Sequence, residues 1–185
     1  DSVLHGLRPG ELILVAGRPG MGKTTFAMNV AECVALGQSI TGEPNKMGEG
    51  KRHPVLFVSL SMSADSFAAR MLYSRAGVSG WRVWHGLMAK AERAEAARRL
   101  DAAKNDLKAA PLDIEDIGID SIEVLCHRAK ALKKDRGIEL VVVDNLQLCP
   151  CADDKEGRQG LAVARQLKNL AQELQVPVIG TLPIR

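Results

Sequence analysis

A glycine-rich segment near the start of the chain has the residue types and the spacing to bind phosphate. It reads GRPGMGKTT, with four residues between Gly17 and Gly22 and with Lys23 directly after Gly22. Glycines let backbone N–H groups turn towards a β-phosphate, lysine neutralises β- and γ-phosphate oxygens, and a threonine hydroxyl ligates Mg²⁺. The segment matches the Walker A pattern, so we expect it to bind ATP and Mg²⁺ through Gly17, Arg18, Pro19, Gly20, Met21, Gly22, Lys23, Thr24 and Thr25.

The segments on either side of this motif have the order that a phosphate-binding loop requires. Residues 11–17, ELILVAG, form a short apolar run ending in glycine, which predicts a strand buried on both faces. Residues 23–36 then place apolar side chains at helical intervals, and Gly37 follows as a C-cap. The alternative is a glycine-rich turn that binds nothing, but a chance match would seldom fall between two such elements.

A carboxylate that could serve this motif stands at the end of another buried run. Asp144 follows four apolar residues, and residues 137–144 predict a strand. An acid at the tip of a buried strand is the partner with which a phosphate-binding loop holds Mg²⁺, so Asp144 is interpreted as the Walker B residue. We therefore expect Lys23, Thr24 and Asp144 to be catalytic, with Thr24 and Asp144 at the metal. The alternative for Asp144 is a turn residue at a strand end.

Strand and helix patterns alternate along the remaining chain. This alternation predicts an α/β fold with a mostly parallel sheet and helices on both faces, built as one domain over residues 1–185. Residues 39–53 are rich in Gly, Lys and Glu without periodicity, so we expect an inserted, exposed loop there. The other predicted strands are 54–61, 112–116 and 176–182, and the other predicted helices are 63–78, 89–111, 121–134 and 160–174.

The composition favours a folded, mildly basic domain. The chain has 185 residues, of which 46% are hydrophobic, and a net charge of +3, which permits nucleic-acid or phosphate ligands without identifying either. No apolar run approaches the roughly 18 residues of a membrane span, so we expect no membrane partner. The cysteines and histidines lack ligand spacing, which favours reduced thiols, a cytoplasmic location and no metal beyond nucleotide-bound Mg²⁺. The cysteines are Cys33, Cys126, Cys149 and Cys151.

The order of these motifs resembles the C-terminal, RecA-like motor domain of DnaB-type replicative helicases. The similar segments are residues 6–31, 55–72, 110–148 and 164–182, so the resemblance covers nearly the whole chain except the loop at 39–53. The pair of segments DNLQL and LKNLAQELQVPV has little reason to occur together in other P-loop families. A recombinase-like or clock-type RecA relative is a weaker alternative, because it would share the P-loop without these two segments.

The resemblance implies a hexameric ring that binds ATP between subunits and translocates on single-stranded DNA, with a helicase loader or primase as a further partner. Lys155 and Arg158 lie where the family places a DNA-facing loop, so they are candidates for contacts to the DNA backbone. A solvated charged loop is an equally good interpretation of these two residues. By the same resemblance, the sequence stops at Arg185, before the family's arginine finger and second DNA loop.

Two positions depart from the family pattern. The family has Ser-Leu-Glu-Met after the second strand, and its glutamate deprotonates the attacking water, whereas this chain has Ser61 in place of the glutamate. A serine hydroxyl is a poor base, and Asn145 cannot replace it because an amide accepts no proton. Pro183 stands where the family has a glutamine that senses the γ-phosphate. The alternative function is therefore a hydrolysis-deficient paralogue that binds nucleotide and regulates, loads or inhibits a helicase.

The segment WRVWH, residues 81–85, raises a separate question. Trp81 and Trp84 share one side of a helix beside Arg82, and such side chains can stack on bases. The alternative, which we favour, is that the two indoles anchor this helix against the core or a neighbouring subunit.

Overall fold

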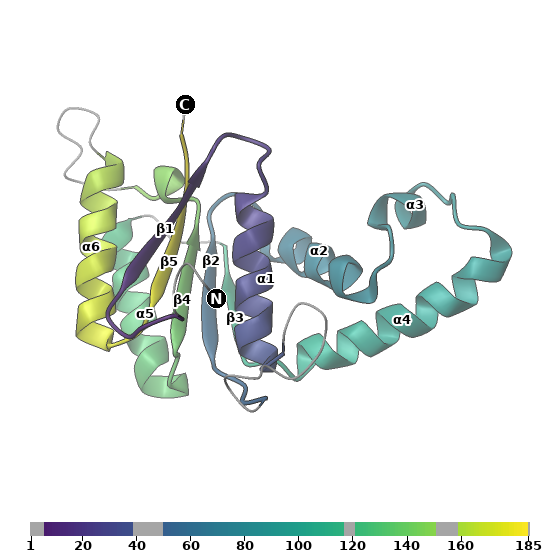
Figure 1. Cartoon of the computed structure of the whole chain (residues 1–185), viewed down its shortest axis with the longest axis horizontal. Coiled ribbons are helices and arrows are strands. Elements are labelled where there is room, and N and C mark those ends of the chain that lie inside the picture. The colour runs from purple at the N-terminus through teal and green to yellow at the C-terminus, as the bar shows by residue number, and fades with distance from the viewer. Residues whose placement is uncertain (1–5, 39–49, 117–120, 151–158, 185) are drawn as a thin grey trace.

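Five short apolar runs of the chain form one parallel sheet. The computed structural model describes residues 6–38, 50–116, 121–150 and 159–184. Within these residues the strand order is β1-β5-β4-β2-β3, and every pairing is parallel. Helices lie on both sides of the sheet (Figure 1), so the expected α/β, RecA-like architecture is confirmed. The strands are β1 (Leu12–Gly17), β2 (Val55–Ser59), β3 (Leu112–Glu115), β4 (Leu140–Asp144) and β5 (Val178–Pro183).

The helices begin and end at residues with clear capping roles. Ser63 and Ser121 cap the second and fifth helices by accepting a hydrogen bond from the backbone N–H three residues on, and Gly37 ends the first helix with φ 65°. The cap at Gly37 confirms the sequence prediction. The helices are α1 (Lys23–Leu36), α2 (Ala64–Ala76), α3 (Gly80–Trp84), α4 (Lys90–Lys108), α5 (Ile122–Arg136), the 3₁₀ turn η1 (Leu146–Leu148) and α6 (Gln159–Leu174).

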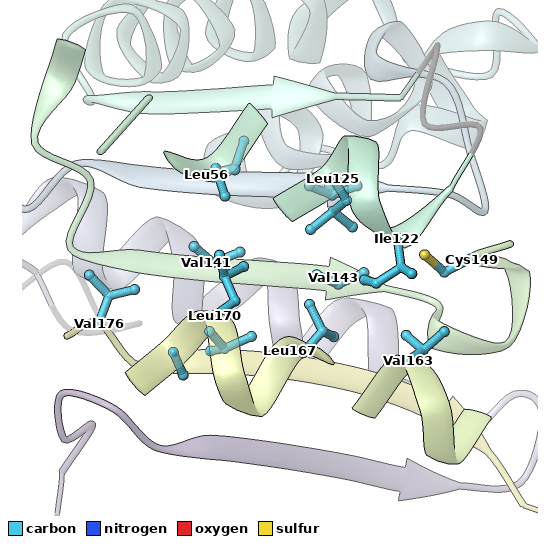
Figure 2. Close-up of a cluster of buried hydrophobic side chains, with 14 of the residues drawn as sticks. Leu56, Ile122, Leu125, Val141, Val143, Cys149, Val163, Leu167, Leu170 and Val176 are labelled. Carbon is cyan, nitrogen blue, oxygen red and sulfur yellow. The ribbon is translucent and has the colours of Figure 1, made fainter. Parts of the chain in front are cut away.

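The period of two along β2 and β4 divides the core into two layers. Leu56, Val141 and Val143 face α5 and α6, as Figure 2 shows for the side chains of this cluster. Phe57 and Val142 belong to a second cluster, which packs against α1 and α2. All five residues of β4 are buried, so this strand lies at the centre of the molecule and presents its last residue, Asp144, at the carboxyl edge of the sheet.

The first strand differs from the sequence prediction. β1 was expected to be buried on both faces, but it lies at one edge of the described sheet, where Leu14 is 47% exposed. The apolar run is real, yet periodicity does not reveal whether a strand is central or at an edge. The predicted strand at 137–144 is also shorter in the structure, because β4 begins at Leu140 and residues 137–139, directly after α5, belong to no helix or strand.

A lobe of three helices extends from the sheet. α2 packs against the core through Phe67 and Met71, whereas α3 and the first half of α4 lie farther out (Figure 1). α4 has 19 residues but buries only Ala96 and Ala103 fully. Its sequence, rich in Ala, Glu, Lys and Arg, forms a helix through intrinsic propensity rather than through an apolar face.

Three further sequence predictions concern the loop, the membrane and the thiols. Of the inserted loop, residues 39–49 lie outside the described residues. In the described ranges, no helix is both long and apolar enough to cross a bilayer. Cys33 and Cys126 are free thiols, as expected, and burial raises the pKa of Cys126 to about 11, so that thiol is uncharged at neutral pH.

Candidate nucleotide-binding site

The glycine-rich loop connects β1 to α1 at the carboxyl edge of the sheet. Gly20 and Gly22 have φ of 80° and 83°, a region that other residues rarely adopt, so both glycines are required by the backbone. Gly22 is the N-cap of α1, and no side chain fills the cap position with a hydrogen bond. The first N–H groups of α1 and its dipole are therefore available to an anion, as expected for a phosphate site.

Lys23 and the pocket beside it provide the space and charge for phosphate. The Nζ atom of Lys23 donates to the carbonyl of Arg18, 3.0 Å away, so the side chain spans the loop. An open pocket of about 620 Å³ adjoins the loop and is lined by Gly17, Lys23, Phe26 and Ile184 among others. The ammonium group thus lies within reach of a phosphate chain bound along the loop.

Asp144 joins the loop to the centre of the sheet. Its carboxylate is 1% exposed and accepts hydrogen bonds from Thr24 Oγ1 at 3.1 Å to Oδ1 and 3.0 Å to Oδ2. These two residues are 120 positions apart in the sequence, and they meet because α1 starts above the strand that ends in Asp144. The structure therefore brings together the two residues that the sequence assigned to the metal.

Two residues that sequence reasoning missed also reach this site. Thr181 on β5 donates its hydroxyl hydrogen to Asp144 Oδ1, and its side chain is fully buried. Arg70 on α2 donates to Thr25 Oγ1 at 2.7 Å, which places a guanidinium beside the phosphate loop. Neither residue follows a local motif, because each contact arises from the packing of a distant strand or helix. A polar residue in the otherwise apolar run of β5 was the one available signal for Thr181.

The two departures from the family pattern both lie at the site. Ser61 follows the end of β2, where Ser59 pairs in register with Asp144, and Ser61 Oγ donates to Asp144 Oδ2 at 2.8 Å. Pro183 pairs in register with Gly17, the first glycine of the loop. The serine and the proline thus occupy positions beside Asp144, the predicted metal-binding acid, and beside the glycine-rich loop.

Other predicted site residues are not brought to the loop. Lys155 and Arg158 lie outside the described residues. Trp81 and Trp84 are 63% and 79% exposed, so they do not anchor α3 against the core, and anchoring against a neighbouring subunit stays a prediction. Trp81 instead stacks on His85, with ring centroids 4.7 Å apart. α3 buries none of its residues and lies on the outer part of the lobe (Figure 1).

The residues of the site fit Mg²⁺ and a nucleotide. Mg²⁺ prefers oxygen ligands, typically one or two protein groups together with phosphate oxygens. Thr24 and Asp144 supply a hydroxyl and a carboxylate next to a loop with free N–H groups and a lysine. In the described part of the chain no group of three or more His, Cys, Asp or Glu residues could hold a metal, so the nucleotide would have to contribute ligands.

The fold and this site define a RecA-like P-loop domain. Comparison with known proteins then identifies the family: the model of the DnaB-like helicase C terminal domain matches residues 1–182. A replicative DNA helicase DnaB of Buchnera aphidicola is 34% identical over 178 residues, and another from Nostoc sp. is 30% identical over 182 residues. A solved structure described as a DnaB-like replicative helicase and its interactions with primase has a TM-score of 0.77 at 24% identity, over 97% of this chain and 40% of that chain.

The chain belongs to the DnaB-like helicase C-terminal domain family. It covers only part of its relatives: the matches span 95% of this chain but 35% of the Buchnera protein, and 97% of this chain but 19% of the Nostoc protein. Family membership implies nucleotide binding by a P-loop ATPase domain. The helicase activity in the names of these relatives belongs to proteins that are much longer than the matched region.

Proposed function

We propose that this chain is the ATP-binding motor domain of a DnaB-like replicative helicase, which assembles as a hexameric ring and translocates on single-stranded DNA. The hydrogen bond between Thr24 and Asp144 supports this proposal best, because it joins the phosphate loop to the acid at the centre of the sheet. In a P-loop protein these two residues hold Mg²⁺ together. The chain would then form one ATPase domain of a longer cytoplasmic protein.

Each residue of the site has a defined task in this proposal. The N–H groups at the start of α1 and the Lys23 ammonium bind the phosphates, and Thr24 and Asp144 hold Mg²⁺. Mg²⁺, when bound, neutralises charge that develops on the phosphate oxygens. Arg70 fixes the Thr25 hydroxyl and adds a positive charge near the loop.

A second candidate function is a paralogue that binds nucleotide without hydrolysing it efficiently, and that regulates, loads or inhibits a helicase. Ser61 favours it, because the side chain in the position of the family's glutamate is a hydroxyl that donates to Asp144. Among the described residues, the three side chains that donate to the Asp144 carboxylate do so through hydroxyl groups, which are poor bases. Pro183 adds to this argument because it has no side-chain amide or backbone N–H.

The partners in this proposal are single-stranded DNA, further copies of the chain and a helicase loader or primase. The contact with primase is described for a solved DnaB-like helicase. Lys155 and Arg158 are the proposed contacts to the DNA backbone, and their replacement by alanine would weaken binding equally for all DNA sequences and reduce its salt dependence.

Nucleotide binding is the first test. We expect the protein to bind ATP with Mg²⁺ in calorimetry, and Lys23→Ala to weaken binding at least about tenfold, since one charge-assisted contact to phosphate contributes roughly 1.5 to 3 kcal/mol. Lys90→Ala, on the outer lobe, is the matched control and should bind like the unchanged protein. Equal affinities for the unchanged protein and Lys23→Ala would remove the basis of the proposal.

Phosphate release from ATP by the longer parent protein separates the two candidate functions. If the protein is a motor, release is fast, single-stranded DNA accelerates it, and a residue other than Ser61 supplies the base. If it is the paralogue, release is slow despite normal binding, and Ser61→Glu raises it on the order of a hundredfold, the usual contribution of a general base. Ser61→Gln is the control, since it lengthens the side chain without providing a base.

A further inference from the structure

Three hydroxyl groups share the carboxylate of Asp144. Thr24 comes from α1, Ser61 from the turn after β2, and Thr181 from β5, so each side of β4 contributes a donor. Oδ1 accepts from Thr24 and Thr181, and Oδ2 accepts from Thr24 and Ser61. Each carboxylate oxygen therefore accepts from two hydroxyls, and the Thr24 hydroxyl is shared between the two oxygens.

This arrangement leaves little capacity for a further partner. A carboxylate has about four lone-pair positions, and each hydroxyl has a single hydrogen to donate. Oδ2 already accepts from both Thr24 and Ser61, so at least one of these two contacts has to weaken when Mg²⁺ takes a lone pair of that oxygen. The question is which of the hydroxyls gives way.

Burial distinguishes Thr181 from Ser61. Thr181 is fully buried on a strand that pairs with both β1 and β4, so its hydroxyl cannot turn to solvent. Without Asp144 it would be a buried hydroxyl without this acceptor, which costs free energy. Ser61 lies in an exposed turn and can exchange Asp144 for water at little cost.

The backbone of the turn around Ser61 allows the Ser61 hydroxyl to move away from the Asp144 carboxylate. Its shape is held by Ser59 Oγ, which donates to the carbonyl of Met62 at 2.7 Å, and by Leu60 N, which donates to the carbonyl of Asp144 at 2.6 Å. Neither bond involves the Ser61 side chain. Ser61 Oγ can therefore leave Asp144 by a side-chain rotation, without a change in the backbone.

We propose that Thr181 is a positioning residue that fixes Asp144 for Mg²⁺, and that Ser61 competes with Mg²⁺ for Oδ2 of the same carboxylate. The inference rests on the proposed nucleotide site. It adds that Thr181 and Ser61 determine how strongly nucleotide binding depends on Mg²⁺. Thr181 and Ser61 then have opposite effects on the Mg²⁺ requirement of nucleotide binding. The Thr181 hydroxyl lowers the Mg²⁺ concentration that is needed, and the Ser61 hydroxyl raises it. A purely structural pair of hydroxyls would not give opposite signs.

The test is calorimetric titration of ADP at a series of Mg²⁺ concentrations, which gives the Mg²⁺ concentration at half-maximal effect. Thr181→Val, which has nearly the same shape, should raise this concentration about tenfold, as expected when a residue that orients a ligand is lost. Thr181→Ser keeps the hydroxyl, so its Mg²⁺ concentration at half-maximal effect should lie within about twofold of that of the unchanged protein. Affinity for ADP without Mg²⁺ should be the same in all three proteins.

Ser61→Ala should change the half-effect Mg²⁺ concentration in the opposite direction to Thr181→Val. It is an exposed position, so the variant folds even if Thr181→Val does not, and it should lower the half-effect concentration roughly threefold because one competing hydrogen bond is removed. An unchanged or raised concentration in Ser61→Ala, or an unchanged one in Thr181→Val, overturns the inference. If instead the unchanged protein binds no ADP, or Lys23→Ala binds it equally well, it is the proposed nucleotide site that fails.

Discussion

At the scale of single residues, glycines decide whether the phosphate loop can close. Gly22 has φ 83°, and nothing lies within 4 Å of the position where a Cβ would stand. The constraint at Gly22 is therefore the backbone conformation and not a lack of space. The same open surroundings at Gly160, whose backbone is helical, provide a comparison in which only the conformation differs.

We expect alanine substitutions at Gly22 and Gly160 to change the free energy of unfolding in opposite directions. Gly22→Ala should lower the free energy of unfolding by about 1 to 2 kcal/mol, the cost of a left-handed conformation for an L-residue. Gly160→Ala should raise it by roughly 0.5 to 1 kcal/mol, because alanine is the better residue in a helix. Urea unfolding measures both. Equal effects of the two substitutions would mean that the loop does not hold Gly22 in this conformation.

The same scale shows how far the sequence predicts the site. Lys23, Thr24 and Asp144 were predicted because each belongs to a local pattern, a loop after a strand or an acid at a strand end. The contacts of Thr181 and Arg70 depend on which strand lies beside β4 and how α2 packs on α1. That information is not local, so the pattern that predicts the acid does not predict what surrounds it.

At the scale of elements, one arginine connects three helices. Arg75 on α2 donates to Glu32 on α1 at 2.9 Å, to Asp106 on α4 at 2.8 Å and to Gln38 just beyond α1 at 2.8 Å. The Arg75 side chain is 15% exposed and that of Glu32 is 14% exposed, so the pair is largely shielded from water. The lobe is thus attached to the α1 layer partly through charge.

We expect Arg75→Met to lower the free energy of unfolding by roughly 2 kcal/mol, because it leaves the Glu32 carboxylate without its partner in a shielded position. Arg98→Met is the matched control: Arg98 pairs with Glu95 on the surface of α4, where its side chain is 78% exposed. That change should cost less than about 1 kcal/mol, as for surface pairs in general. Denaturant unfolding of both variants is the measurement, and similar losses would contradict a connecting role for Arg75.

Element patterns predicted the strands and helices well but not their neighbours. The alternation of apolar runs and helices specifies a parallel sheet, and Ser63, Ser121 and Gly37 mark helix ends by local hydrogen bonding. The sheet order places β5 between β1 and β4, and that order leaves β1 at an edge. Burial of β1 depended on this long-range pairing, which is why the expectation from its apolar run was wrong.

At the scale of the whole molecule, the sheet and the lobe have different amounts of buried apolar surface. β4 is buried along its entire length, and α5 buries Ile122, Leu125, Ala129 and Leu132 against the sheet. α4, although longer than α5, buries only two alanines fully, and the exposed pair Trp81 and Trp84 lies just before it. Local stability follows buried contacts, so the outer lobe should open more readily than the sheet.

Hydrogen exchange on the protein without nucleotide tests this difference. We expect amides in the first half of α4 to exchange at least about tenfold faster than amides in the middle of α5, and those of β4 to exchange most slowly, through global unfolding. α5 is the internal control, since it is also a surface helix and has 15 residues against 19 in α4. Equal protection of α4 and α5 would contradict the inference that the lobe is a separate, less stable unit. Protection of α4 that increases with protein concentration would instead show that a second copy covers the lobe, where the tryptophans are exposed.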